Sequence, residues 1–123
     1  RYAYAFRSLL DHGTVLAFGS DAPVAPTDPM RNIYTAVMRQ DEHGEPAGGW
    51  YPEERLTVAE AIEAYTLGPA RLSGKADRFG VITPGRSADL AVLSHNLFAI
   101  NPADIHHTTA WLTLFNGRVV HEP

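Results

Sequence analysis

One carboxylate in this chain stands where a catalytic group would be expected. Asp21 comes directly after the apolar run 14–18, separated from it by Gly19 and Ser20. An apolar run without alternation suits a strand buried on both faces of a parallel sheet, and α/β folds keep their working residues just beyond the carboxyl ends of such strands. An Asp before Pro23 is equally suited to capping a turn. The pattern alone leaves both roles open for Asp21.

The histidines and the loop aromatics are weaker candidates. His106 and His107 are adjacent, so on a strand they would point to opposite faces and could not easily share a metal ion. We expect them to be a solvated loop pair, and His12 to interact with the dipole at a helix end. Trp50 and Tyr51 could line a pocket, although loop aromatics more often simply pack down. No partner at metal-ligand spacing accompanies His43, His95 or His121.

The composition excludes several classes of protein. The 123 residues carry a net charge of -4, with 45% hydrophobic and 20% charged residues, which is typical of one globular domain and argues against disorder. The acidic balance disfavours nucleic acid as a partner. The absence of cysteine excludes disulfides, thiol nucleophiles and iron–sulfur clusters. No apolar run approaches the ~18 residues of a membrane helix, so we expect no membrane contact and a cytoplasmic location.

In the first part of the chain, the elements that must position Asp21 are predicted to be helices. Asp28 is expected to cap a helix with Pro29 at its first position, because both residue types favour those places. Thr57 and Glu60 form a capping box ahead of a further apolar stripe. The predicted helices span residues 3–11, 29–39 and 57–67.

The later part of the chain is predicted to be β. Residues 81–85 indicate a short strand and a turn. The segment 108–115 is rich in β-branched and aromatic residues, and it leads into Asn116-Gly117, the strongest short signal for a hairpin. The predicted strands span residues 14–18, 89–94, 108–115 and 118–122.

Five segments of the chain, taken together in their order along the sequence, resemble a known protein family. The segment 84–93 contains the sequence Pro-Gly-x-x-Ala-Asp-Leu, which marks metal-dependent amidohydrolases generally, and 18–24 contains Gly-Ser-Asp. The chain resembles the amidohydrolase superfamily, and most closely its family 3, a YtcJ-like group that includes N-substituted formamide deformylases. The five segments are 18–24, 28–39, 56–66, 84–93 and 116–120.

The resemblance implies an α/β fold. Members of this family are (β/α)8 barrels with a small β-sandwich built from both chain ends, and such a barrel needs ~200 residues or more. We therefore expect a C-terminal fragment of a larger enzyme, beginning at Arg1 without an initiator methionine. Residues 1–74 would be the end of the barrel domain, with its last strand and helices. Residues 75–123 would be the C-terminal part of the β-sandwich.

The resemblance also implies metal-assisted hydrolysis of C–N bonds in amides or formamides. Of the family's metal ligands, only the aspartate after the last barrel strand is present, as Asp21. Divalent ions, with zinc expected, would activate a water and polarise the carbonyl. Asp21 would bind the metal and pass the water's proton to the leaving nitrogen. We expect the fragment alone to hold no metal and to be inactive, and we expect its partners to be a small amide-type substrate and further copies of itself.

Two other functions are alternatives to the amidohydrolase. The chain could be a stand-alone, non-catalytic binding or oligomerisation domain derived from an amidohydrolase. A His-x-His pair encoded ~200 residues or more upstream of Arg1 would favour the hydrolase, whereas an initiator methionine just before Arg1 would favour the stand-alone domain. A different α/β hydrolase with Ser20 as nucleophile is disfavoured, because the nucleophile-elbow glycines and a matched histidine are missing.

Overall fold

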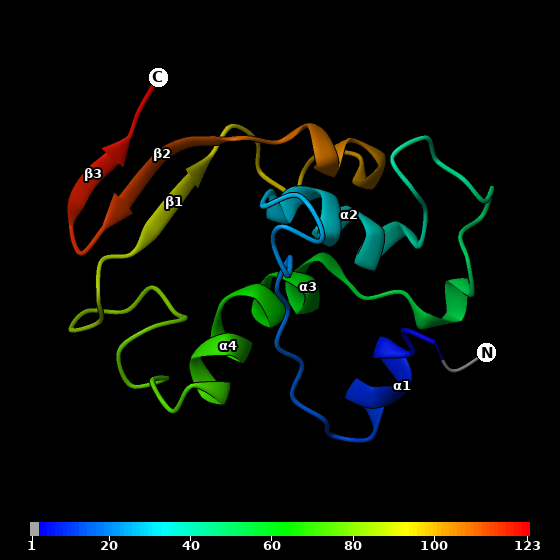
Figure 1. The fold of residues 1–123 in the computed structure, drawn as a ribbon, viewed down its shortest axis with the longest axis horizontal. Helices are drawn as coiled ribbons and strands as arrows, with labels where there is room; N and C mark the ends of the chain where they lie inside the picture. Colours follow the sequence, from blue (N-terminus) through cyan, green and yellow to red (C-terminus); the bar gives the residue numbers. More distant parts are fainter. Residues whose placement is uncertain (1–2) are drawn as a thin grey trace.

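Helix α2 (Pro29–Met38) lies at the centre of the fold. The computed structural model describes residues 3–123 (Figure 1). Asp28 caps α2 as predicted, since its carboxylate accepts a hydrogen bond of 2.9 Å from the backbone N–H of Met30. The apolar stripe of α2 is buried against the rest of the chain, which confirms the helix predicted at 29–39.

The other helices are shorter than predicted. Helix α1 (Phe6–Asp11) begins later than residue 3, and α3 (Val58–Tyr65) ends before residue 67, where α4 (Leu67–Leu72) follows. The capping box of α3 is present as predicted, with the Thr57 side chain accepting from the Glu60 backbone and the Glu60 side chain accepting from the Thr57 backbone. Two short 3-10 helices, η1 (Pro52–Glu54) and η2 (Pro102–His107), complete the helical elements of the described chain.

Three antiparallel strands form a small sheet in the order β1-β2-β3 at one end of the molecule (Figure 1). Strand β1 (Leu90–Leu93) pairs with β2 (Ala110–Phe115), which pairs with β3 (Arg118–His121). Asn116 and Gly117 join the last two strands with φ angles of 49° and 77°. Two successive positive φ angles are those of a type I′ hairpin turn. The three strands predicted at 89–94, 108–115 and 118–122 are therefore confirmed.

The strand predicted at 14–18 is wrong. Residues 14–18 run extended along α3 and α4, but no strand pairs with them among the described residues. The Phe18 backbone N–H instead donates to the carbonyl of Ala64 at 2.7 Å. A buried parallel strand needs neighbouring strands on its sides, and the described residues supply none. The short strand expected within 81–85 is also wrong, because these exposed residues form bends and a turn.

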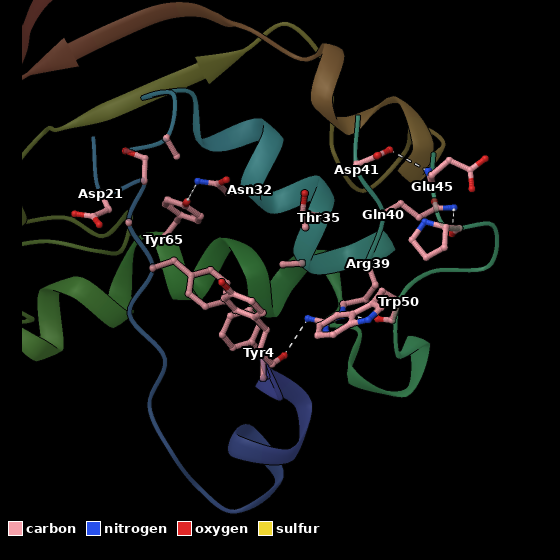
Figure 2. A pocket seen from close by; sticks show the side chains of 17 residues that line it. Tyr4, Asp21, Asn32, Thr35, Arg39, Gln40, Asp41, Glu45, Trp50 and Tyr65 are labelled. Carbon is pink, nitrogen blue, oxygen red and sulfur yellow. Dashed lines mark hydrogen bonds between the residues drawn. The ribbon is translucent and has the colours of Figure 1, made fainter. Parts of the chain in front are cut away.

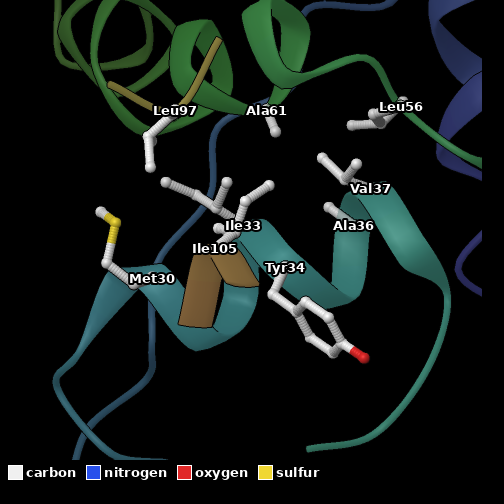
Figure 3. Close-up of a cluster of buried hydrophobic side chains, with 9 residues drawn as sticks. All are labelled: Met30, Ile33, Tyr34, Ala36, Val37, Leu56, Ala61, Leu97 and Ile105. Carbon is white, nitrogen blue, oxygen red and sulfur yellow. The ribbon is translucent and has the colours of Figure 1, made fainter. Parts of the chain in front are cut away.

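The hydrophobic core lies between α2, α3 and η2 (Figure 3). Ile105 of η2 and Ala61 of α3 are fully buried against α2, and Leu97 joins them from the connection between β1 and η2. The structure is thus a mixed helical and antiparallel fold. Within residues 3–123, no helix combines the length and the hydrophobicity that crossing a membrane requires.

Candidate functional site

Asp21 lies where the extended segment 14–18 reaches its end. Its backbone is in the left-handed region, with φ of 53°, which Asp tolerates better than most residues. The Asp21 carbonyl accepts a hydrogen bond of 2.8 Å from the Val24 backbone N–H, which closes a turn. The carboxylate itself accepts no hydrogen bond from any described residue. Gly19 does not adopt a positive φ, so the sharp change of direction occurs at Asp21 and not at Gly19.

A cavity of about 760 Å³ opens beside Asp21 (Figure 2). This volume lies in the range of small-molecule binding sites. Figure 2 shows Asp21 at one end of the cavity and Trp50 at the other, with α2 forming the wall between them. Five aromatic rings contribute to the lining: Tyr4, Phe6, Phe18, Trp50 and Tyr65.

The aromatic rings contact one another in a continuous series along the cavity. The ring of Phe18 lies 5.7 Å from Tyr65 and 4.8 Å from Phe6, measured between ring centroids. Tyr4 continues the series, 6.0 Å from Phe6 and 6.4 Å from Trp50. Rings in tilted and edge-on contact at these separations attract each other beyond simple burial. One side of the cavity is therefore formed by a continuous series of rings that support each other.

Asn32 and Tyr65 form a polar pair within the cavity. The Asn32 side-chain amide donates a hydrogen bond of 2.7 Å to the Tyr65 hydroxyl oxygen. A tyrosine hydroxyl can donate as well as accept. Because the amide already occupies one acceptor position, the hydroxyl proton remains able to bind an acceptor in the cavity. This pair is hence a possible contact for a polar group of a ligand.

Arg39 closes the end of the cavity that lies away from Asp21. Its side chain is nearly buried, with 5% exposed. The guanidinium donates from Nε to the Trp50 carbonyl at 3.0 Å and from Nη1 to the Tyr4 carbonyl at 2.9 Å. Its Nη2 is buried without a partner among the described residues. Burial lowers the pKa of Arg39, although the nearby Glu54 and Glu53 carboxylates oppose this shift.

Asp41 and Glu45, the two acidic residues of the loop after α2 that line the cavity, are engaged by backbone groups of their own loop. The Asp41 carboxylate accepts hydrogen bonds from the backbone N–H groups of Glu45 at 3.0 Å and His43 at 2.9 Å. These bonds, chiefly the one from Glu45, lower the pKa of Asp41. Glu45 in turn accepts from the backbone N–H of Ala47. Both carboxylates stabilise the loop that carries Trp50.

The described residues do not complete a metal centre. Across residues 3–123, no three His, Cys, Asp or Glu side chains come close enough together to hold an ion. His106 and His107 lie side by side in η2, with ring centroids 3.9 Å apart. The expectation of a solvated loop pair is wrong for His106, which is partly buried and packs edge-on against Tyr34 at 4.5 Å. Asp21 alone cannot bind a catalytic metal tightly.

The remaining histidine candidates lie apart from this cavity. His12 contacts the Ser8 carbonyl at 2.7 Å, which places it at the end of α1 as expected. His95 and His121 are in the β-rich part and contact Ser94 and Ala110. Trp50 does line the cavity, one of the two roles considered for it.

Tyr4, Asn32 and Arg39 are among the cavity residues that the sequence analysis did not single out. Asn32 and Arg39 occur within a helical segment where polar residues ordinarily face solvent. No spacing signal marks Arg39, because its partners are the distant backbone carbonyls of Tyr4 and Trp50. Only the folded chain brings these groups together.

Comparison with known proteins identifies the family. The model of the amidohydrolase family matches residues 1–121. YtcJ of Bacillus subtilis (strain 168), named as an amidohydrolase, is 40% identical over 120 residues, which cover 98% of this chain and 23% of that protein. The N-substituted formamide deformylase of Arthrobacter pascens is 36% identical over 119 residues, covering 97% of this chain and 21% of that enzyme.

A solved structure agrees with this assignment at the level of the fold. The amidohydrolase from Thermotoga maritima MSB8 aligns with a TM-score of 0.65 and 24% sequence identity, covering 98% of this chain and 26% of that one. The chain spans about a quarter of the length of these relatives. The match of the family model over nearly every residue shows that the chain belongs to the amidohydrolase family.

Proposed function

We propose that this chain is the carboxyl-terminal part of a metal-dependent hydrolase that cleaves C–N bonds of amides or formamides. Residues 1–74 would complete the barrel domain, and residues 75–123 would complete the small β-sandwich. Membership of the amidohydrolase family and the much greater length of the relatives support this reading. The observation that carries it is the Asp21 carboxylate, which accepts no hydrogen bond from residues 3–123 and lies at one end of the cavity.

In this proposal Asp21 carries the proton. Divalent ions, zinc foremost, would acidify a water and polarise the substrate carbonyl when bound by the complete protein. An Asp21 carboxylate oxygen takes up the proton that the attacking water loses. It then gives this proton to the nitrogen as the C–N bond breaks, which yields a carboxylic acid and an amine. The 123 residues by themselves would be inactive, because the described residues do not complete the metal centre.

Replacement of Asp21 tests the proposal. In the full-length protein, Asp21→Asn keeps the size of the side chain but cannot take up a proton, and a proton-transfer group is typically worth about a hundred- to ten-thousand-fold in rate. We expect kcat to fall at least about a hundredfold on the best substrate of a formamide and amide panel, with little change in Tm.

A matched carboxylate serves as the control. Asp77 is exposed in the turn after α4 and lies outside the cavity, so Asp77→Asn should leave kcat within about twofold. Asp89 is a poorer control, because its carboxylate accepts the backbone N–H of Asn116 at the hairpin. Retention of more than about a tenth of the turnover in Asp21→Asn would show that Asp21 is a turn residue only.

A non-catalytic binding or oligomerisation domain is the second candidate function. It is favoured by the large apolar side chains that remain exposed, among them Trp111 and Phe115 on β2. The open reading frame decides between the two. An encoded His-x-His pair ~200 residues or more upstream of Arg1 supports the hydrolase, and an initiator methionine just before Arg1 supports the binding domain.

A further inference from the structure

We propose that the Tyr65 hydroxyl is a further catalytic residue, which donates a hydrogen bond to the carbonyl oxygen of the substrate while Asn32 holds the hydroxyl in place. The inference rests on the proposed function. When water adds to an amide, negative charge develops on the carbonyl oxygen, and a fixed hydrogen-bond donor at that oxygen stabilises the charge. Three observations on the described residues single out Tyr65: its place, its free proton and its fixed orientation.

Tyr65 is fastened to the segment that ends in Asp21. The backbone N–H of Phe18 donates to the carbonyl of Ala64, the residue before Tyr65, at 2.7 Å. The Phe18 and Tyr65 rings meet edge-on, with centroids 5.7 Å apart. Asp21 follows Phe18 by three residues, which span at most about 10 Å. Figure 2 shows Tyr65 and Asn32 at the same end of the cavity as Asp21. A substrate whose scissile bond lies beside Asp21 is therefore also brought to Tyr65.

The Tyr65 hydroxyl keeps a proton that it can donate to a ligand. Most other donors of the cavity are engaged by backbone carbonyls of the chain itself. The Thr35 hydroxyl donates to a carbonyl one turn earlier in α2 at 3.0 Å, and the Gln40 amide donates to a carbonyl of its own loop at 2.6 Å. Arg39 donates to two carbonyls at the far end of the cavity. The Tyr65 oxygen instead accepts a hydrogen bond, and no described residue takes its proton.

Asn32 fixes the direction of this hydroxyl. Its side-chain amide donates to the Tyr65 oxygen at 2.7 Å, which joins α2 to the last residue of α3, two helices that pack on each other in the core. A donor on the oxygen also polarises the O–H bond, because linked hydrogen bonds strengthen one another. The Ser20 hydroxyl, by contrast, has no partner among the described residues that would fix it. Tyr65 therefore presents an oriented and polarised O–H group.

The hydroxyl acts without giving up its proton. As the water oxygen bonds to the carbonyl carbon, the π electrons of the C=O bond move onto the oxygen, and the hydrogen bond from Tyr65 strengthens. When the C–N bond breaks, the carbonyl re-forms and the hydrogen bond weakens again, while Asp21 gives its proton to the nitrogen. Tyr65 thus binds the transition state more tightly than the substrate, so its loss should lower kcat and leave KM nearly unchanged.

Tyr65→Phe in the full-length protein removes the hydroxyl and keeps the ring that packs on Phe18. Loss of one such donor typically lowers kcat by about a hundred- to a thousandfold. Other groups share the charge, so we expect a fall of at least about tenfold, with KM changed by less than about threefold. Tyr34→Phe is the matched control, because it removes a tyrosine hydroxyl outside this cavity and should leave kcat within about twofold. A kcat for Tyr65→Phe within about twofold of wild type, or a rise in KM alone, would overturn the inference.

Asn32→Asp tests the direction of the hydrogen bond. A carboxylate has nearly the size of the amide but can only accept, so it would bind the Tyr65 proton and withdraw it from the substrate. We expect Asn32→Asp to lower kcat by at least about tenfold. In the Tyr65→Phe protein the same substitution should change kcat by less than about threefold, because no hydroxyl proton remains. Equal falls in both proteins would show that the added charge is responsible, and would overturn the positioning role of Asn32.

Infrared spectroscopy of a bound amide separates this inference from the proposed function. The probe is acetanilide labelled with a heavy isotope at the carbonyl carbon, bound to the full-length Asp21→Asn protein, so no turnover is needed. A donor at the carbonyl oxygen lowers the C=O stretching frequency. Adding Tyr65→Phe should therefore raise this frequency, whereas adding Tyr34→Phe should not. The same frequency with and without the Tyr65 hydroxyl would overturn the inference. A frequency that depends on Tyr65, in a protein whose wild type hydrolyses no amide of the panel, would overturn the proposed function alone.

Discussion

Glu60 shows how one side chain can serve both a helix end and a long-range contact. Its carboxylate accepts hydrogen bonds from the Arg7 guanidinium and from the Thr57 backbone N–H. These contacts, chiefly the one from Arg7, lower its pKa from 4.5 to about 2 against the opposing effect of burial. The ionised carboxylate is therefore favoured in the folded state, and it ties α1 to the start of α3.

The depressed pKa of Glu60 predicts a pH-dependent stability. A carboxyl group whose pKa is lower in the folded than in the unfolded chain stabilises the fold in its ionised form. For Glu60 this stabilisation is complete above the unfolded pKa of about 4.5, and it is lost as the pH falls to about 2. Such a shift corresponds to at most about 3.5 kcal/mol. Since Arg7 and Glu60 are partly open to solvent, we expect Glu60→Gln to lower the free energy of unfolding by about 1–2 kcal/mol at pH 7.

Urea unfolding of the wild type and Glu60→Gln at several pH values measures this effect. The difference between the two proteins should be largest above about pH 4.5 and should nearly vanish near pH 2. Asp104→Asn is a suitable control, because Asp104 is exposed and its carboxylate makes no hydrogen bond or ion pair with the described residues. A Glu60→Gln difference of the same size at pH 2 and pH 7 would show that the ion pair with Arg7 does not stabilise the fold.

At the scale of elements, α4 packs directly on the segment that leads to Asp21. Gly68 makes this approach possible, because a Cβ atom there would lie 2.0 Å from the Leu16 carbonyl oxygen and 3.3 Å from the Ala17 Cα. Backbone atoms cannot move aside as a flexible side chain can. The position of the Asp21 segment therefore depends on the absence of a side chain in α4.

Gly68→Ala should destabilise the protein, even though alanine is the better helix former. Overpacking of this kind costs typically about 1–3 kcal/mol. We expect a lower Tm for Gly68→Ala. Gly19→Ala provides the comparison, since Gly19 has no positive φ and a Cβ there would meet nothing within 4 Å. A Tm for Gly68→Ala equal to that of Gly19→Ala would mean that α4 does not press on this segment.

At the scale of the whole molecule, large apolar side chains remain on the surface. Val24 is 81% exposed and Ile82 is 87% exposed, while Trp111 and Phe115 are exposed on β2. Within residues 3–123, no further strand pairs with the outer edges of β1 and β3. Exposed apolar patches and strand edges favour association with another chain.

We therefore predict that the 123-residue chain self-associates. Light scattering should detect dimers or larger species as the concentration rises to roughly 100 μM, the range in which exposed edges pair. Phe115→Lys should reduce this association, because a charge at this exposed position of β2 opposes burial of the apolar face against another chain. A monomer that persists across the whole concentration range would contradict the prediction.

The sequence by itself determined the features that depend on neighbouring residues. Asp28 caps α2, Thr57 and Glu60 form their capping box, and Asn116 with Gly117 turns the hairpin. Each of these features depends on hydrogen bonds and dihedral angles within about four residues, so the local pattern is sufficient. The order of the longer motifs likewise indicated the amidohydrolase family, which the family model matches over residues 1–121.

Only the tertiary structure decided how distant segments meet. The run 14–18 has the composition of a buried strand, yet strand pairing depends on neighbours that the described residues do not provide. The cavity likewise joins Tyr4, Asp21 and Trp50 through the buried Arg39. Whether an arginine faces solvent or links two loops depends on how segments far apart in the sequence pack together. The spacing of neighbouring residues does not predict that packing.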